Sequence, residues 1–184
     1  MRIPAILTST TDQALIPLYA AVKSGLGMVP NLMQVTGNSP AALSAYLSLN
    51  AALGKGHLPA AIRERIALVI AQDNTCEYCL AAHTLLGGHA GLDAAEMQRA
   101  RLGTSSDPFA AAVVSLARTI NRTHGRIDDL TLAEARRQGL DDAAIIETIA
   151  HVALNILTNS INNVARTTVD FPAAPTLAAA AQST

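Results

Sequence analysis

The sequence predicts an all-α fold, and three observations lead to that prediction. Ala and Leu dominate a chain of 184 residues, of which 50% are hydrophobic and only 3% aromatic. This composition favours close-packed helices over sheets, in which β-branched and aromatic residues are enriched. Pro and Gly recur between segments whose apolar residues follow helical spacing. No segment of convincing length alternates apolar and polar residues as a half-buried strand would.

Capping residues, proline and glycine set the predicted helix boundaries. Asp12, or Thr11 before it, can cap a first helix that runs towards residues 25–27. Ser39 followed by Pro40 is typical of an N-cap with proline in the first helical position. The predicted helices span about residues 11–27, 40–53, 59–72, 75–86, 93–101, 107–124, 131–138 and 141–164.

A single domain is expected to hold residues 1–172, followed by an Ala-rich tail over residues 173–184 that lies on the surface or frays. Residues 64–69 resemble residues 147–152, which would be explained by two related helical halves. In a chain so rich in Ala, chance explains this match nearly as well.

Charge and hydropathy exclude several classes of partner. The net charge is −1 and no basic run exceeds two residues, so nucleic acid is not an expected partner. The N-terminal apolar stretch is too short and broken for a signal peptide, and no apolar run approaches the ~20 residues that span a bilayer. We therefore expect a soluble, cytoplasmic protein with no membrane partner. In a reducing compartment, two cysteines indicate catalysis or metal binding rather than a structural disulfide.

The only two cysteines, Cys76 and Cys79, lie three residues apart, and His83 follows four residues later. On an α-helix, steps of three and four residues place all three side chains on one stripe. Two thiols one turn apart can close into a disulfide, and an imidazole one turn further on can move their protons. This combination indicates redox chemistry.

The position of the two cysteines in their helix favours a reactive thiol. Asp73, Asn74 and Thr75 are candidate caps that place both cysteines in the first turn. Unpaired N–H groups and the positive end of the helix dipole favour a thiolate there. His83 can accept the thiol proton, and Glu64, on the preceding helix, can orient His83 or pass protons to bulk water.

Other interpretations of these residues stay open. A zinc site could join both cysteines and His83 to a fourth ligand such as His57, His89 or Glu64, although the chain lacks a second closely spaced ligand pair. Both thiols could instead be buried and inert, since free cysteine is among the most buried residue types. Two arginines flank Glu64, so a surface salt bridge is its alternative role.

Tyr78, His151 and Asn155 are candidates for lining a substrate pocket. Tyr78 lies beside the second cysteine and either shapes a pocket mouth or simply packs. His151 sits among apolar residues, so a hydrogen-bonded core histidine is the alternative to a cavity residue. Asn155, Asn159 and Asn163 recur every four residues and form a polar ladder, which is either a subunit interface or a wet pocket wall.

The pattern formed by Glu64, Cys76, Cys79 and His83 resembles the signature of the alkylhydroperoxidase D-like family of the carboxymuconolactone decarboxylase superfamily. Flanking segments resemble the peroxidase-related branch, and the resemblance covers about residues 25–172. The segments that carry it are Val29-Pro30-Asn31-Leu32, Ser39-Pro40, Leu58-Pro59, Arg63-Glu64-Arg65, residues 149–155, Thr158-Asn159 and Asp170-Phe171-Pro172.

The resemblance implies an all-helical subunit that assembles into homo-oligomers, commonly dimers, trimers or hexamers. By the family's mechanism, Cys79 attacks the peroxide, Cys76 is the more exposed resolving thiol, and Glu64 and His83 form a proton relay. The best-known members carry a second histidine just before the second cysteine, where this chain has Tyr78. A phenol with a pKa of about 10 is a poor proton shuttle at neutral pH, which implies a shorter or slower relay here.

Together these features predict a thiol-dependent peroxidase that reduces organic hydroperoxides through a Cys76–Cys79 dithiol/disulfide cycle. Leu80 and Leu85 are expected to favour organic peroxides over hydrogen peroxide. The predicted partners are a small-molecule hydroperoxide and an external thiol or dithiol reductant, and no cofactor or metal is expected. The alternatives are a lactone decarboxylase, which would not need the thiol pair, a zinc-stabilised helical module, and a redox sensor that forms the disulfide without sustained turnover.

Overall fold

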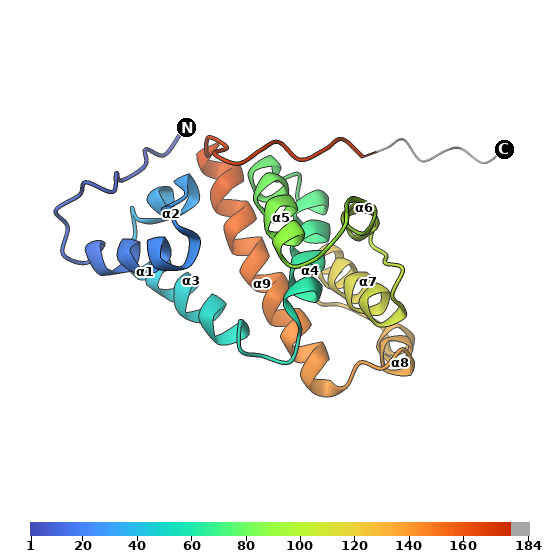
Figure 1. The fold of residues 1–184 in the computed structure, drawn as a ribbon. Coiled ribbons are helices and arrows are strands. Elements are labelled where there is room, and N and C mark those ends of the chain that lie inside the picture. The colour runs from blue at the N-terminus through green and yellow to red at the C-terminus, as the bar shows by residue number, and fades with distance from the viewer. Residues whose placement is uncertain (178–184) are drawn as a thin grey trace.

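The computed structural model describes residues 1–177. In this part of the chain it contains nine α-helices and no strand, which confirms the predicted all-α class. Figure 1 shows α1–α3 on one side of α9 and α4–α8 on the other. The helices are α1 (Ile16–Leu26), α2 (Asn31–Thr36), α3 (Pro40–Leu53), α4 (Ala60–Asp73), α5 (Glu77–His89), α6 (Ala94–Arg101), α7 (Pro108–Thr123), α8 (Asp129–Arg137) and α9 (Asp142–Ala165).

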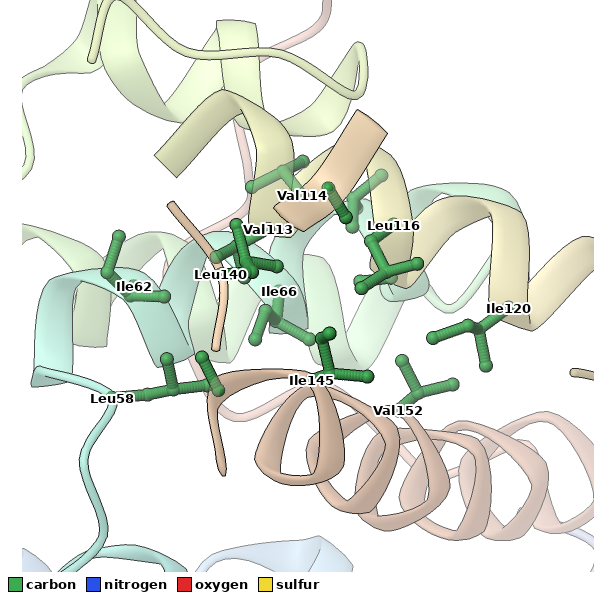
Figure 2. Packing of buried hydrophobic residues seen from close by; sticks show 14 of the residues in the cluster. Leu58, Ile62, Ile66, Val113, Val114, Leu116, Ile120, Leu140, Ile145 and Val152 are labelled. Carbon is green, nitrogen blue, oxygen red and sulfur yellow. The ribbon is translucent and has the colours of Figure 1, made fainter. Parts of the chain in front are cut away.

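The main hydrophobic core lies where α4, α7 and α9 meet. Helix α4 packs against α5, α6, α7 and α9. Ile66 of α4, Val113 of α7 and Val152 of α9 are buried in this core, and Figure 2 shows their aliphatic side chains converging with Leu140 from the loop before α9. Removing this apolar surface from water stabilises the fold. It also fixes α4, the helix that carries Glu64, against α9.

Helix α9 is the one helix among residues 1–177 that is long and apolar enough to cross a membrane, judged by length and composition alone. Half of its apolar stretch (50%) is buried inside the protein. It contacts α4, α5 and α7 as well as α2 and α3. This is the placement of a central helix that holds a helical bundle together.

The N-terminal helices cover the two cysteines. A second hydrophobic cluster joins Tyr19 of α1 and Leu43 of α3 to Cys76 and Cys79. The first part of the chain therefore builds one wall of the site, although its sequence carries none of the reactive residues.

Most predicted helix boundaries agree with the structure to within a few residues. The Ser39 side chain caps α3 by accepting a backbone hydrogen bond of 3.2 Å, as predicted. Helix α2 is missing from the prediction, because Pro30 is its N-cap rather than an interruption of the chain. Helix α1 begins at Ile16, later than predicted, because Asp12 accepts its 2.8 Å backbone hydrogen bond in the turn before the helix.

Helix α5 continues past Gly87 and Gly88, where the sequence predicts its end. Gly87 is buried, and a Cβ atom there would lie 3.1 Å from Met97 Sδ and 3.4 Å from Leu92 Cδ1. This glycine therefore allows close packing of α6 on α5 and does not end the helix. The chain turns instead at Gly91, whose φ of 87° lies in the left-handed region.

The chain after α9 is held against the rest of the protein, including the first residues of the tail that is expected to lie on the surface or fray. Phe171 packs edge-on against Tyr78 with ring centroids 5.5 Å apart. The Arg101 guanidinium donates a 2.6 Å hydrogen bond to the carbonyl of Pro175. The segment runs across the end of α9 and over α5 and α6 (Figure 1). The rest of the predicted tail, residues 178–184, lies outside the described residues.

Candidate active site

The turn between α4 and α5 places the two cysteines. Asn74 ends α4, and Thr75 has a φ of 52°, in the left-handed region that residues other than glycine rarely adopt. Such a conformation costs about 1 kcal/mol or more and persists only where the surroundings hold it. Here Asn163 Nδ2 donates to the Asn74 carbonyl at 2.8 Å, and Asn74 Nδ2 donates to Asn159 Oδ1 at 3.1 Å. Helix α9 thus fixes the backbone that leads into the first cysteine.

These contacts assign the asparagine ladder of α9. Asn159 holds the α4–α5 turn through its Oδ1 atom and Asn163 holds it through its Nδ2 atom. Asn155 donates from Nδ2 to the His151 carbonyl at 2.8 Å and lines a cavity. The ladder is therefore an internal clamp at one end and part of a polar cavity wall at the other.

Cys76 and Cys79 form a disulfide in this structure, with their Cα atoms 5.3 Å apart. Cys76 is the N-cap of α5, and its Sγ accepts a hydrogen bond of 3.3 Å from the Cys79 backbone N–H. Cys79 Sγ accepts a hydrogen bond of 3.3 Å from Asn162 Nδ2. After reduction, the helix N-terminus can stabilise negative charge on one sulfur and the amide can stabilise it on the other.

Both cysteines are buried: the exposed fraction is 0% for Cys76 and 2% for Cys79. The expectation that Cys76 is the more exposed thiol is wrong in this structure. The reason is that both residues belong to the cluster covered by the N-terminal helices.

Glu64 and His83 form a pair near the cysteines, as their spacing predicts. Glu64 Oε2 lies 2.8 Å from His83 Nδ1, and both side chains are partly exposed. With the Nδ1 proton directed at the carboxylate, His83 Nε2 is left to accept or return a proton. The alternative surface salt bridge does not form, because the neighbouring Arg65 pairs with Glu96 at 3.0 Å.

A cavity of about 390 Å³ lies beside this pair. Its polar side includes Glu64 and His83 together with Tyr46, His151 and Asn155, so the structure places two of the three predicted pocket residues there. Its apolar wall comes mainly from the N-terminal helices, which contribute Ala21, Val22, Leu26, Leu32, Met33 and Leu47. The cavity thus combines an ionisable side with an apolar side.

Burial controls protonation at the polar side of the cavity. His151 is 4% exposed, and burial, followed by the charge of nearby Arg63, lowers its pKa below the ordinary value. The ring is therefore neutral at neutral pH, and its Nε2 has no hydrogen-bond partner among residues 1–177. Burial and then the Glu64 carboxylate raise the pKa of Tyr46 to about 12, so this phenol keeps its proton as a hydrogen-bond donor.

Tyr78 does not line this cavity, and packing is the role that its contacts show. Its side chain points to another face of α5, because successive helical residues are rotated by about 100°. Its hydroxyl accepts a 3.1 Å hydrogen bond from the Leu32 N–H, and its ring packs on Phe171, so it anchors α2 and the C-terminal segment. Leu80 and Leu85 are also absent from the cavity wall: the first packs against two core clusters and the second is exposed.

The predicted zinc ligands do not come together. Within residues 1–177, no group of three or more His, Cys, Asp or Glu side chains is arranged to hold a metal ion. Both thiols are used in the disulfide. The described residues thus do not supply the four ligands of a structural zinc site.

Asn162 contacts the sulfur of Cys79, and it is not among the site residues that the sequence predicts. It is 3% exposed and lies 83 residues from Cys79 in sequence. The one available signal is that it follows Asn159 by a single helical turn and so extends the ladder by one step. That spacing alone does not reveal what the side chain contacts.

A comparison with protein families matches residues 40–119 to the Carboxymuconolactone decarboxylase family. The matched segment spans α3 to α7 and includes Glu64, Cys76, Cys79 and His83. No curated protein matches the sequence.

Solved structures share the fold at low sequence identity. A peroxidase-related protein from Ralstonia eutropha JMP134, described as an alkylhydroperoxidase AhpD core, aligns with a TM-score of 0.82 at 19% identity over 92% of both chains. A peroxidase-related protein from Silicibacter sp. TM1040 aligns with a TM-score of 0.78 at 20% identity over 91% of both chains. The debrominase Bmp8, in complex with 2,3,4-tribromopyrrole, aligns with a TM-score of 0.75 at 19% identity over 90% of both chains. Residues 40–119 of the chain thus match the carboxymuconolactone decarboxylase family, and the chain shares its helical fold with alkylhydroperoxidase D-like, peroxidase-related proteins.

Proposed function

We propose that this protein is a thiol peroxidase that reduces organic hydroperoxides through the Cys76–Cys79 pair. One observation carries the proposal: the pair lies in the first turn of α5, one helical turn before a histidine hydrogen-bonded to a glutamate at 2.8 Å. The pair can store two electrons, and the histidine and glutamate can move the protons that accompany them.

In the first step, the Cys79 thiolate attacks one oxygen of the O–O bond. A sulfur–oxygen bond forms, the O–O bond breaks, and the electron pair leaves with the alkoxide. His83, backed by Glu64, supplies the proton that converts the alkoxide into the alcohol. Cys79 is then a sulfenic acid, oxidised by two electrons, and the hydroperoxide is reduced by two electrons.

In the second step, the Cys76 thiolate attacks the sulfur of the sulfenic acid. The disulfide forms, and the departing hydroxide takes a proton to become water. The 3.3 Å contact from the Cys79 N–H to Cys76 Sγ favours this thiolate, because an N-cap sulfur faces the positive end of the helix. An external thiol then restores the dithiol.

The apolar wall of the cavity supports an organic rather than an inorganic peroxide, since removing an alkyl or aryl group from water adds binding free energy.

The proposal includes a cytoplasmic homo-oligomer. Large apolar side chains are exposed along the outer face of α9, and a second copy of the chain would cover them. They are Ile146, Ile149, Ile156, Leu157 and Val164.

A thiol count tests the proposal directly. We expect one equivalent of cumene hydroperoxide to remove both free thiols of the fully reduced protein and to release cumyl alcohol. Dithiothreitol should restore both thiols, and metal content is measured on the same sample. Thiols that survive an excess of hydroperoxide contradict the peroxidase function. In that case, activity on a lactone would support the decarboxylase alternative.

A halogenated aromatic is the second candidate substrate, because the debrominase Bmp8 shares the fold. In a thiol-driven debromination, a carbon–bromine bond is replaced by carbon–hydrogen, bromide leaves, and two thiols are oxidised to a disulfide. Incubating the reduced protein with 2,3,4-tribromopyrrole separates the two functions. Bromide release with the loss of two thiols, without reaction towards cumene hydroperoxide, would favour dehalogenation.

The hydrogen bond from Asn162 to Cys79 predicts a role in oxidation. Asn162→Leu keeps a similar volume but removes the donor, and a hydrogen bond to a charged group contributes about 1.5–3 kcal/mol. We expect oxidation of the reduced protein to slow about tenfold or more, measured by stopped-flow thiol loss. Asn38→Leu is the matched control, because Asn38 is exposed, bonds only the carbonyls of Pro4 and Val35, and does not line the cavity. Equal rates in the two variants would show that the amide does not stabilise the reacting sulfur.

A further inference from the structure

A second opening of about 390 Å³ lies at the other end of the cysteine pair. It is a groove lined by residues from the end of α9, the beginning of α5 and the segment that follows α9. Helix α5 contributes Glu77 and Tyr78 to the lining of the groove. It contributes Ala82, His83 and Leu86 to the lining of the cavity. Along the helix, Cys79 therefore lies between the groove residues and the cavity residues. The groove and the cavity share no lining residue.

Two residues that line the groove carry buried polar atoms that lack a partner. Asn162 Oδ1 and Thr167 Oγ1 have no hydrogen bond to any residue in the described part of the chain. Asn162 is 3% exposed and Thr167 is 8% exposed. Buried polar groups are nearly always hydrogen-bonded, so an acceptor and a hydroxyl that lie buried beside one groove without a partner favour a polar ligand there. Asn162 also contacts Cys79 Sγ, which ties this groove to the disulfide.

The rim of the groove carries one charge of each sign. Glu77 and Arg166 are exposed groove residues, and neither forms an ion pair with another residue of the range 1–177. A guanidinium recognises a carboxylate, and a carboxylate recognises an ammonium group. The groove therefore offers complementary groups for a small zwitterion with an amide or similar polar centre.

We infer that this groove binds the reductant of the Cys76–Cys79 disulfide, and that the reductant is a small zwitterionic thiol of the cysteine or γ-glutamyl-cysteine type. Arg166 would hold its carboxylate, Glu77 its ammonium group, and the Asn162 and Thr167 oxygens its polar centre. This inference rests on the proposed function for the cycle as a whole. Reduction itself requires only the disulfide.

The chemistry of this step is thiol–disulfide exchange. The thiolate of the reductant attacks Cys76 Sγ, a mixed disulfide forms, and the sulfur–sulfur bond to Cys79 breaks. Cys79 leaves with the electron pair as a thiolate, which accepts the hydrogen bond from Asn162. A second reductant thiolate attacks the reductant sulfur of the mixed disulfide and releases Cys76. Two external thiols become one external disulfide, and their two protons pass to the two cysteines.

The position of the groove explains why Cys76 is the sulfur under attack. Thr75 and Glu77 flank Cys76 in sequence, line the groove and are exposed, whereas Cys76 itself is covered. In this proposal the exposed side chains of Thr75 and Glu77 turn aside to admit the thiol to Cys76, while α9 continues to hold the backbone of the turn. Cavity and groove thus give oxidant and reductant separate routes to the same pair.

Reduction of preformed disulfide by glutathione tests the groove. The disulfide is first formed with diamide, so the experiment does not depend on any reaction with a hydroperoxide. We expect the rate of thiol release to saturate with glutathione concentration. Arg166→Gln and Glu77→Gln should each raise the half-saturating concentration at least about fivefold, since each removes a hydrogen-bonded charge pair. Arg126→Gln, an exposed arginine outside the groove, should leave it unchanged.

An uncharged thiol completes the test. All four proteins should be reduced by 2-mercaptoethanol at equal rates, because this thiol has no charge for Glu77 or Arg166 to bind. A rate that rises linearly with glutathione, or saturation that neither groove variant alters, overturns the assignment of this groove. The proposed peroxidase function is tested separately, because it fails only if the thiols of the reduced protein survive cumene hydroperoxide.

Discussion

Cys79→Ser is expected to abolish hydroperoxide turnover, because a serine hydroxyl is not ionised at neutral pH and is a far weaker nucleophile than a thiolate. Cys76→Ser should behave differently. Its Cys79 thiolate can still attack once, and the protein should then stall as a sulfenic acid or as a mixed disulfide with the external thiol. Steady-state consumption of cumene hydroperoxide with dithiothreitol measures turnover. Intact-protein mass spectrometry after one equivalent of oxidant identifies the stalled species.

The comparison of the two variants is internally controlled. Both remove the same disulfide, so any change in thermal stability that results from its loss is shared. Turnover retained in Cys79→Ser and lost in Cys76→Ser would reverse the two roles. That result would have a structural basis. Cys76 is the N-cap of α5, and its Sγ accepts a hydrogen bond from the Cys79 N–H. Of the two cysteine positions, the N-cap is the one that favours a thiolate more.

Local sequence signals predict most of the fold because the helix ends depend on neighbouring residues. Ser39 before Pro40, and the apolar stripe that includes Ile66, give the start of α3 and the course of α4. The end of α5 is not predictable in the same way. Gly87 resembles a helix stop in sequence, but it serves the packing of Met97 against α5, a contact that only the tertiary structure reveals.

The chemistry of the site is more predictable than its shape. Glu64, Cys76, Cys79 and His83 belong to two consecutive helices, so a short connection brings them together and their spacing carries the information. The apolar wall of the cavity comes instead mainly from α1, α2 and α3, which precede the segment with the reactive residues and contribute ordinary apolar side chains. Asn162 is likewise hidden, because its contact with Cys79 depends on where the end of α9 docks.

Glu64→Gln is expected to lower kcat/KM for cumene hydroperoxide about a hundredfold or more, the range typical for loss of an acid–base group. Glutamine can still hydrogen-bond His83 but cannot balance the charge of a protonated imidazole, so His83 loses its ability to take up and return a proton. His83→Asn should cause a similar loss, and the double variant should be no slower than the slower single variant. Such non-additivity shows that the two residues act as one unit.

Glu134→Gln is the matched control for this prediction, because Glu134 is an exposed glutamate of α8 that pairs with Arg137 and lies outside the cavity. It should leave kcat/KM unchanged. Two measurements on the purified proteins show which step is slowed. Stopped-flow oxidation of the fully reduced proteins reports the step in which the O–O bond breaks, where a proton relay acts. Glutathione reduction of the preformed disulfide reports the recycling step, which uses the groove. If the Glu64→Gln protein is oxidised at the normal rate but reduced slowly, Glu64 acts in the recycling step and not in the peroxide step. Multiplicative losses in the double variant would instead mean that Glu64 and His83 act independently, despite the 2.8 Å between them.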